Sequence, residues 1–185
     1  MKLAVFFPGI GYTVDKPLMH YSRRIAEKLG YEIRLLPYTG FPEKRPGDTA
    51  YMEQAFELAY AQSLEMLSGL DLAAYEEILF VGKSIGTAVA ARIAAESPEK
   101  DRIRLLLYTP LQATFAYPVG QALAFTGTKD QWTSPVTPGI AEICEEKGIP
   151  CVEIPDANHS LECGDVIRDI EILRGIMEKT QEFIK

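Results

Sequence analysis

The chain has 185 residues, of which 47% are hydrophobic and 24% are charged, and its formal net charge is −7. This apolar content excludes a disordered chain, and the acidic balance disfavours a protein that coats nucleic acid. Three cysteines are an odd number and do not make a disulfide framework. The length is a little over that of one typical domain, so we expect a single domain over residues 1–185.

The first apolar run, residues 3–7, is short and stops at Pro8-Gly9. A secretory signal needs ~7–15 apolar residues and a membrane helix needs ~18, and the sequence contains neither. The cysteines are interpreted as free thiols. These features predict a cytoplasmic protein without a membrane partner.

Short β-rich runs alternate with longer helical stretches along the chain. The runs that indicate strands are residues 3–7, 32–36, 78–81, 103–108, 122–126 and 151–154. The stretches that indicate helices are residues 17–29, 48–68 with Asp48 as a cap, 85–95, 138–147 and 162–183. Alternation of this kind predicts an α/β fold, with a doubly wound, mostly parallel, six-stranded sheet covered by helices on both faces.

Residues 82–86 read Gly-Lys-Ser-Ile-Gly and lie between the strand expected at 78–81 and a helix rich in small residues. The pattern G-x-S-x-G in this context is a nucleophile elbow, a sharp turn that holds its serine in strained backbone geometry above the sheet edge. The glycines are expected because the tight turn leaves no room for side chains on either side of the serine. Ser84 is therefore the predicted nucleophile, while Lys83 is expected only to help fix the turn.

A serine nucleophile needs a base, usually histidine, and the chain has two, His20 and His159. His159 follows the last expected strand, whereas His20 lies inside the first expected helix. Because strand-end loops meet at one edge of a parallel sheet, His159 is the predicted base. Asp130, in the loop after the strand at 122–126, is the predicted orienting acid, with Asp156 as the alternative.

Two backbone N–H groups are expected to form an oxyanion hole. One belongs to Ile85, directly after the nucleophile, and the other to Ile10, in the glycine-containing loop after the first strand. Tyr12 and Trp132 are the aromatic residues expected to touch a substrate at this edge. The chemistry requires no cofactor, and the irregular cysteine spacing does not indicate a metal site.

With Ser84, Asp130 and His159 in this order along the chain, the sequence resembles the α/β-hydrolase superfamily over essentially its whole length. The elbow is the most specific part of the resemblance. Residues 127–130 look like the acid loop of that family, and residues 158–160 look like its histidine loop.

The resemblance also implies details of the fold. The chain begins at what the family would call its third strand, so the family's first two strands are absent. The strands are expected to lie side by side in the order 32–36, 3–7, 78–81, 103–108, 122–126 and 151–154. The loop at 110–120 is too short for the usual cap, so the chain resembles the minimal, lidless members.

The implied activity is that of a serine hydrolase, which cleaves a small acyl ester or thioester through an acyl-enzyme intermediate. Two alternatives stay open: an acyltransferase that uses the same triad, and a catalytically inert binding protein of the same fold. The expected partner is a small-molecule acyl substrate. The strand at 32–36 lacks its usual neighbours, and a bare edge of this kind is a candidate surface for a homodimer.

Overall fold

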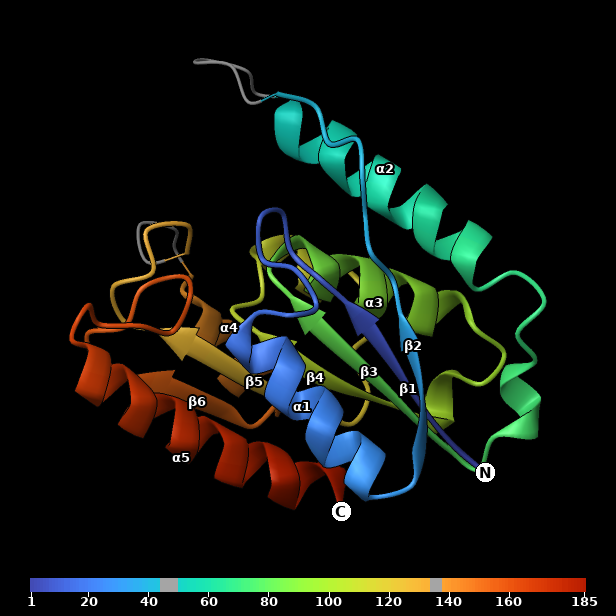
Figure 1. The fold of residues 1–185 in the computed structure, drawn as a ribbon. Helices are drawn as coiled ribbons and strands as arrows, with labels where there is room; N and C mark the ends of the chain where they lie inside the picture. The colour runs from blue at the N-terminus through green and yellow to red at the C-terminus, as the bar shows by residue number, and fades with distance from the viewer. Residues whose placement is uncertain (44–49, 134–137) are drawn as a thin grey trace.

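A computed structural model describes residues 1–43, 50–133 and 138–185 of the protein (Figure 1). In this part of the chain, one sheet is built from β1 (Lys2–Phe7), β2 (Tyr31–Leu35), β3 (Glu77–Lys83), β4 (Ile103–Tyr108), β5 (Ala122–Gly127) and β6 (Cys151–Ile154). All neighbouring strands are parallel, in the order β2-β1-β3-β4-β5-β6. Strand order and direction both confirm the sequence prediction.

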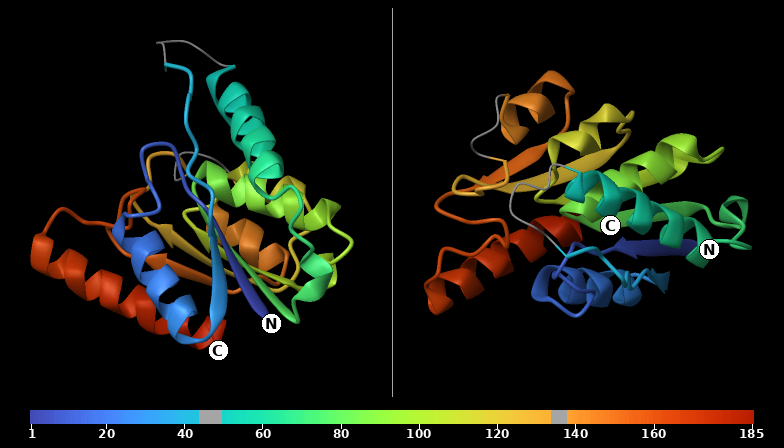
Figure 2. Two further views of the ribbon diagram at one scale, coloured as in Figure 1. Left: turned by 45° about the vertical axis from the view of Figure 1, so that its right-hand side comes forward. Right: turned by 90° about the horizontal axis from the view of Figure 1, so that it is seen from above.

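Helices cover both faces of this sheet. The α-helices of the described residues are α1 (Pro17–Lys28), α2 (Tyr51–Met66), α3 (Ile85–Glu96), α4 (Ile140–Glu146) and α5 (Val166–Ile184). Short 3-10 helices are η1 (Leu72–Ala74), η2 (Lys100–Arg102) and η3 (Gln112–Ala116). Seen from above, α1 and α5 lie on one side of the sheet and α2, α3 and α4 on the other (Figure 2).

The largest difference from the predicted helices that the described residues show lies at the N-terminus of α5. Asp48, the expected cap of α2, lies outside the described residues, and α2 is described from Tyr51 onward. Helix α5 begins at Val166, four residues later than expected, because the Asp165 side chain accepts hydrogen bonds from the N–H groups of Ile167 and Arg168. The delayed start leaves residues 160–165 as a loop after His159.

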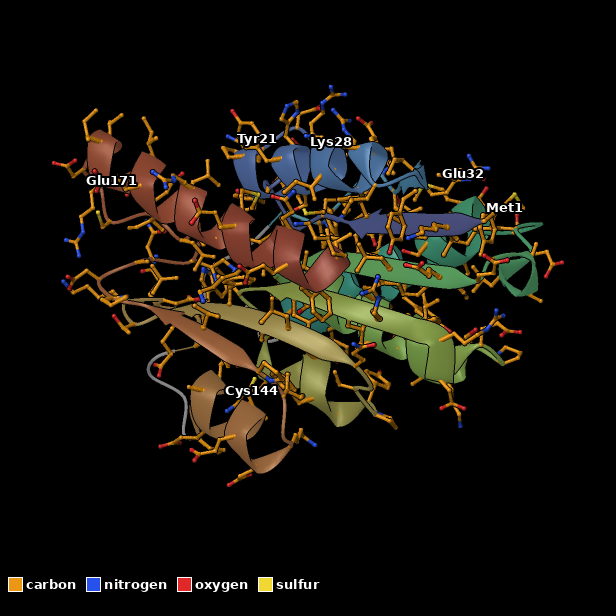
Figure 3. All side chains as sticks on the ribbon, turned by 90° about the horizontal axis from the view of Figure 1, so that it is seen from below. Met1, Tyr21, Lys28, Glu32, Cys144 and Glu171 are labelled. Carbon is orange, nitrogen blue, oxygen red and sulfur yellow. The ribbon has the colours of Figure 1, made fainter. Side chains whose placement is uncertain are left out.

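The core has two layers, and β3 contributes to both. Ile78 and Phe80 pack in the layer beneath α2, α3 and α4, whereas Leu79 and Val81 pack in the layer beneath α1 and α5. A strand that is buried on both faces has a continuous apolar sequence, which is why the β3 run is uninterrupted. Figure 3 shows side chains filling the space on both sides of the sheet, with Tyr21 and Lys28 turned outward from α1.

Strand β2 lies at one edge of the sheet, as expected. Glu32 and Arg34 form an ion pair on this strand with an N–O distance of 2.7 Å, and both side chains are partly exposed. Charged side chains on an edge strand disfavour pairing with another chain. The homodimer through this edge stays a prediction.

Two further observations concern the segments around the sheet. The chain between β4 and β5, residues 109–121, contains only η3 and no cap domain. Among the helices of the described residues, none combines the length and the apolar character that crossing a bilayer requires.

Candidate active site

Ser84 lies in the turn that joins β3 to α3. Its φ is 54° and its ψ is −123°, a conformation that a residue with a side chain rarely adopts. Helix α3 begins at the next residue, Ile85, so the positive end of the helix dipole lies at the serine. The backbone geometry is that of the predicted elbow.

The two elbow glycines allow α3 to approach the sheet closely. A Cβ atom on Gly86 would lie 2.0 Å from the carbonyl oxygen of Phe7 and 2.5 Å from that of Pro8. A Cβ atom on Gly82 would lie 2.7 Å from the Cα atom of Thr87. The glycines are thus required by the contact of the elbow with β1 and with the first turn of α3.

This geometry predicts that Gly86→Ala lowers the free energy of unfolding by at least about 3 kcal/mol, because the clash is with backbone that cannot move aside. The higher helix propensity of alanine offsets only about 1 kcal/mol of this loss in the free energy of unfolding. The matched control is Gly120→Ala, where an added Cβ meets no atom within 4 Å. Urea denaturation of the three proteins measures the difference, and equal losses in both variants would contradict the packing argument.

Three side chains from three strand-end loops form a continuous set of hydrogen bonds. His159 Nε2 lies 2.8 Å from Ser84 Oγ, and His159 Nδ1 lies 2.7 Å from Asp130 Oδ2. The carboxylate favours the tautomer in which Nδ1 carries the proton, so Nε2 is left to accept from the serine hydroxyl. The structure therefore brings together the three residues that the sequence singled out.

Asp130 is completely buried, and its Oδ1 accepts a hydrogen bond from the Trp132 N–H at 2.9 Å. Burial raises the pKa of Asp130, but the hydrogen bond and charge of His159, together with hydrogen bonds from Trp132 and Thr133, outweigh it. The pKa of Asp130 is therefore below its usual value. The carboxylate stays ionised and orients the imidazole.

The pKa of His159 lies below its usual value. Burial is the largest cause, and the positive charge of Lys83 also lowers the pKa, whereas the hydrogen bond and charge of Asp130 raise it. A lowered pKa leaves the imidazole neutral at neutral pH, which is the form a general base needs.

The alternative candidates lie elsewhere. The Asp156 carboxylate is exposed and contacts Lys129 Nζ at 2.8 Å and Arg168 at 3.2 Å. His20 lies in α1, with its Nδ1 3.4 Å from an Arg23 nitrogen. Asp130 is thus the carboxylate that meets His159.

A small cavity of about 160 Å³ opens at Ser84. Its lining combines the elbow, the histidine loop, the acid loop, the loop after β1 and the first turn of α2: Ile10, Tyr51, Met52, Ser84, Trp132 and His159. Trp132 is 42% exposed, and its ring lies 6.0 Å from that of His159 between centroids. Trp132 therefore lies where the sequence predicted a substrate contact.

Tyr51 and Met52 were not foreseen as lining residues. They follow no strand, so the rule that strand-end loops carry the site does not find them. They reach the cavity because α2 begins above the carboxyl edge of the sheet (Figure 1).

Ile10 lies in a tight turn that presses against the elbow. The backbone groups of Gly9 and Tyr12 exchange hydrogen bonds of 3.1 and 3.3 Å, which places Ile10 and Gly11 at the centre of the turn. The φ of Gly11 is 70°, as the third residue of a type II turn requires. A Cβ atom on Gly9 would lie 3.2 Å from the Cβ atom of Ser84, so the turn carries Ile10 to the nucleophile.

Tyr12 does not line the cavity at Ser84, contrary to the sequence prediction. Its hydroxyl accepts a hydrogen bond from the Leu18 N–H at 3.2 Å, and its side chain is only 9% exposed. It lines a second cavity of about 350 Å³, between α1 and α5. The turn centred on Ile10 and Gly11 reverses the chain and directs Tyr12 into the core layer beneath these helices.

The described residues contain no group of three or more His, Cys, Asp or Glu side chains arranged to hold a metal ion. The thiols of Cys144, Cys151 and Cys163 are free.

No family model matches the sequence, and a search of curated proteins finds no match. Solved structures do match. An α/β serine hydrolase without a lid from Xanthomonas campestris has a TM-score of 0.63 and 15% identity, over 98% of this chain and 80% of that one. An esterase from Pyrococcus furiosus has a TM-score of 0.64 and 15% identity, over 99% and 82%.

A protein of unknown function from Agrobacterium tumefaciens, proposed to be an α/β hydrolase, has a TM-score of 0.67 and 14% identity, over 99% and 84% of the two chains. At identities this low, the structural similarity establishes the fold alone. The chain has the α/β-hydrolase fold.

Proposed function

We propose that this protein is a serine hydrolase that cleaves a small acyl ester or thioester through an acyl-enzyme intermediate. The observation that carries the proposal is the hydrogen-bonded series Ser84–His159–Asp130 at a strained elbow. Strain of this kind costs about 1–3 kcal/mol and is concentrated at functional sites. The fold shared with an esterase and a serine hydrolase adds support by analogy.

The acylation step follows from the geometry. Ser84 Oγ attacks the acyl carbonyl carbon while His159 Nε2, 2.8 Å away, takes the hydroxyl proton. The Asp130 carboxylate stabilises the imidazolium that forms. The N–H groups of Ile85 and Ile10 stabilise the oxyanion, each worth roughly 10²–10³ in rate. His159 then gives its proton to the leaving alcohol or thiol as the carbon–oxygen or carbon–sulfur bond breaks.

Deacylation uses the same groups in reverse order. His159 takes a proton from water, the water oxygen attacks the acyl carbon, and Ser84 leaves with the proton that His159 returns. The products are a carboxylic acid and the free enzyme. No cofactor takes part in this scheme.

The cavity favours a small acyl group. Its volume of about 160 Å³ is small beside the ~300–1,000 Å³ that is usual for ligand pockets. Its walls include the apolar side chains of Ile10, Met52 and Trp132, which suit a short hydrocarbon chain. We therefore expect acetyl to butyryl groups to be accepted and long chains to be rejected.

The test is labelling by a fluorophosphonate, followed by an acyl-chain panel. We expect one covalent adduct, mapped to the peptide that contains Ser84. Acetyl and butyryl esters or thioesters should turn over at least about tenfold faster than octanoyl ones. The reason is that the additional methylene groups of an octanoyl chain do not fit in the cavity. Folded protein that gives neither adduct nor turnover would overturn the proposal in favour of a binding protein. If the protein forms the adduct but, when an alcohol is added, transfers the acyl group to the alcohol and releases no carboxylic acid, the protein is an acyltransferase and not a hydrolase.

A further inference from the structure

Lys83 directly precedes Ser84, yet its side chain is only 1% exposed. It ends β3, and because side chains alternate along a strand, it shares with Leu79 and Val81 the face covered by α1 and α5. Lysine is almost never fully buried unless its charge has a partner. The reaction described above leaves this buried amine without a role.

Two neighbours of the amine favour its charged form, although burial opposes it more strongly. Nζ lies 4.9 Å from the centroid of the Tyr12 ring, a cation–π contact. The buried Asp130 carboxylate attracts the ammonium group. The charge of Lys83 also acts on His159, whose Nε2 lies 2.8 Å from Oγ of the residue that follows Lys83.

Two tyrosine hydroxyls on this side remain neutral, whereas the carboxylates of Glu162 and Asp169 line the adjoining cavity. Burial raises the pKa of Tyr12 to about 12, with Glu162 adding to the effect. Burial also raises the pKa of Tyr108, whose hydroxyl hydrogen-bonds to Ser22 and Thr180. Asp130 is thus the buried anion that both Lys83 and a protonated His159 would share.

Burial lowers the pKa of Lys83 to about 7, with Asp130 acting in the opposite direction. Below this value Lys83 is a cation, and a second cation on His159 would be repelled by it. Above this value Lys83 is neutral and the repulsion is gone.

We propose that Lys83 is a positioning residue that acts through His159: its buried ammonium group, which lies over the Tyr12 ring directly before the elbow serine, keeps the imidazole unprotonated in mildly acidic solution. The triad thereby keeps a competent base at a pH where an ordinary histidine is already charged. The catalytic consequence rests on the proposed hydrolase function, whereas the effect on the imidazole does not.

The first experiment measures the imidazole directly. The chain contains two histidines, so nuclear magnetic resonance of histidine-labelled protein can follow His159, with His20 as an internal reference. We compare wild type with Lys83→Met and Lys83→Gln, which remove the charge at similar length. Lys129→Met is the matched control, because Lys129 precedes Asp130 but its amine is at the surface, paired with Asp156.

His159 should titrate at higher pH in both Lys83 variants and at the wild-type pH in Lys129→Met. In wild type, the His159 resonances should shift a second time near neutral pH, as Lys83 loses its proton. If one Lys83 variant does not fold, the other still provides the comparison. The second shift in wild type can be measured without any variant. An unmoved or lowered His159 midpoint in a folded Lys83 variant, or no second shift in wild type, would overturn the proposal.

The second experiment measures kcat/KM at about pH 5.5 relative to about pH 8 for each protein. We expect this ratio to fall about threefold or more when Lys83 is replaced, because a larger fraction of His159 is then protonated at the lower pH. An unchanged ratio in active Lys83 variants would contradict the proposal. If no protein turns over an ester, the hydrolase function fails, while the resonance titration still decides the role of Lys83.

Discussion

Ser84→Ala should reduce kcat/KM for a small ester by about 10⁴–10⁶-fold and abolish fluorophosphonate labelling. Ser84 Oγ is the atom that His159 Nε2 activates, and an alanine leaves neither a nucleophile nor an acceptor for the acyl group. The Cβ atom is retained, so the strained φ of 54° and the fold should persist. Steady-state kinetics with an acetyl ester and intact-mass spectrometry measure the two effects.

Ser160→Ala is the matched control for this variant. Ser160 is the neighbour of His159 in sequence, but its side chain lines the cavity between α1 and α5. Its removal should change kcat/KM by less than about twofold, as is usual for a surface substitution away from the reaction. Turnover by Ser84→Ala above about one per cent of wild type would show that another group is the nucleophile.

Asp130→Asn should reduce kcat by about 10³–10⁴-fold while KM changes little. The asparagine has nearly the same shape, and its oxygen can still accept from the Trp132 N–H. Its amide nitrogen, however, would donate toward His159 Nδ1 and force the ring proton onto Nε2, where it blocks acceptance from Ser84. A thermal unfolding curve for the variant separates this effect from a loss of folded protein.

Asp156→Asn provides the comparison that the sequence itself suggests. Asp156 is close to His159 along the chain, but its carboxylate is exposed and paired with Lys129 and Arg168. We expect kcat within about threefold of wild type, because an exposed ion pair contributes about 1 kcal/mol or less. Similar losses in both variants would mean that Asp130 is not the orienting acid.

The alternation of apolar runs and helical stretches was sufficient to predict the sheet. The strands at 103–108 and 151–154 have the predicted bounds, and β3 is longer than predicted by one residue at its start and two at its end. These patterns are local, because each buried strand must present apolar side chains whatever its neighbours are. The elbow is recognised locally too, since its glycines stand at fixed spacing around Ser84, although the backbone that Gly86 must approach belongs to β1 and the residue after it.

Other features depended on segments that are distant in sequence. The choice between Asp130, the predicted acid, and Asp156, the alternative, depends on how two loops fold against each other, and it is Asp130 that meets His159 in the structure. Tyr12 follows a strand but packs in the core layer beneath α1 and α5, and Tyr51 reaches the cavity from a helix that follows no strand at all.

The sequence by itself therefore determined the α/β fold, the strand order that its family resemblance implied, and the candidate residues Ser84, Asp130 and His159. Only the tertiary structure decided which carboxylate meets the imidazole, which side chains line the cavity, and that Lys83 is buried beside the triad. The physical reason is one of range. Backbone pattern and helix or strand periodicity are set within a few residues, whereas burial and the direction of a loop side chain are set by whatever packs against it.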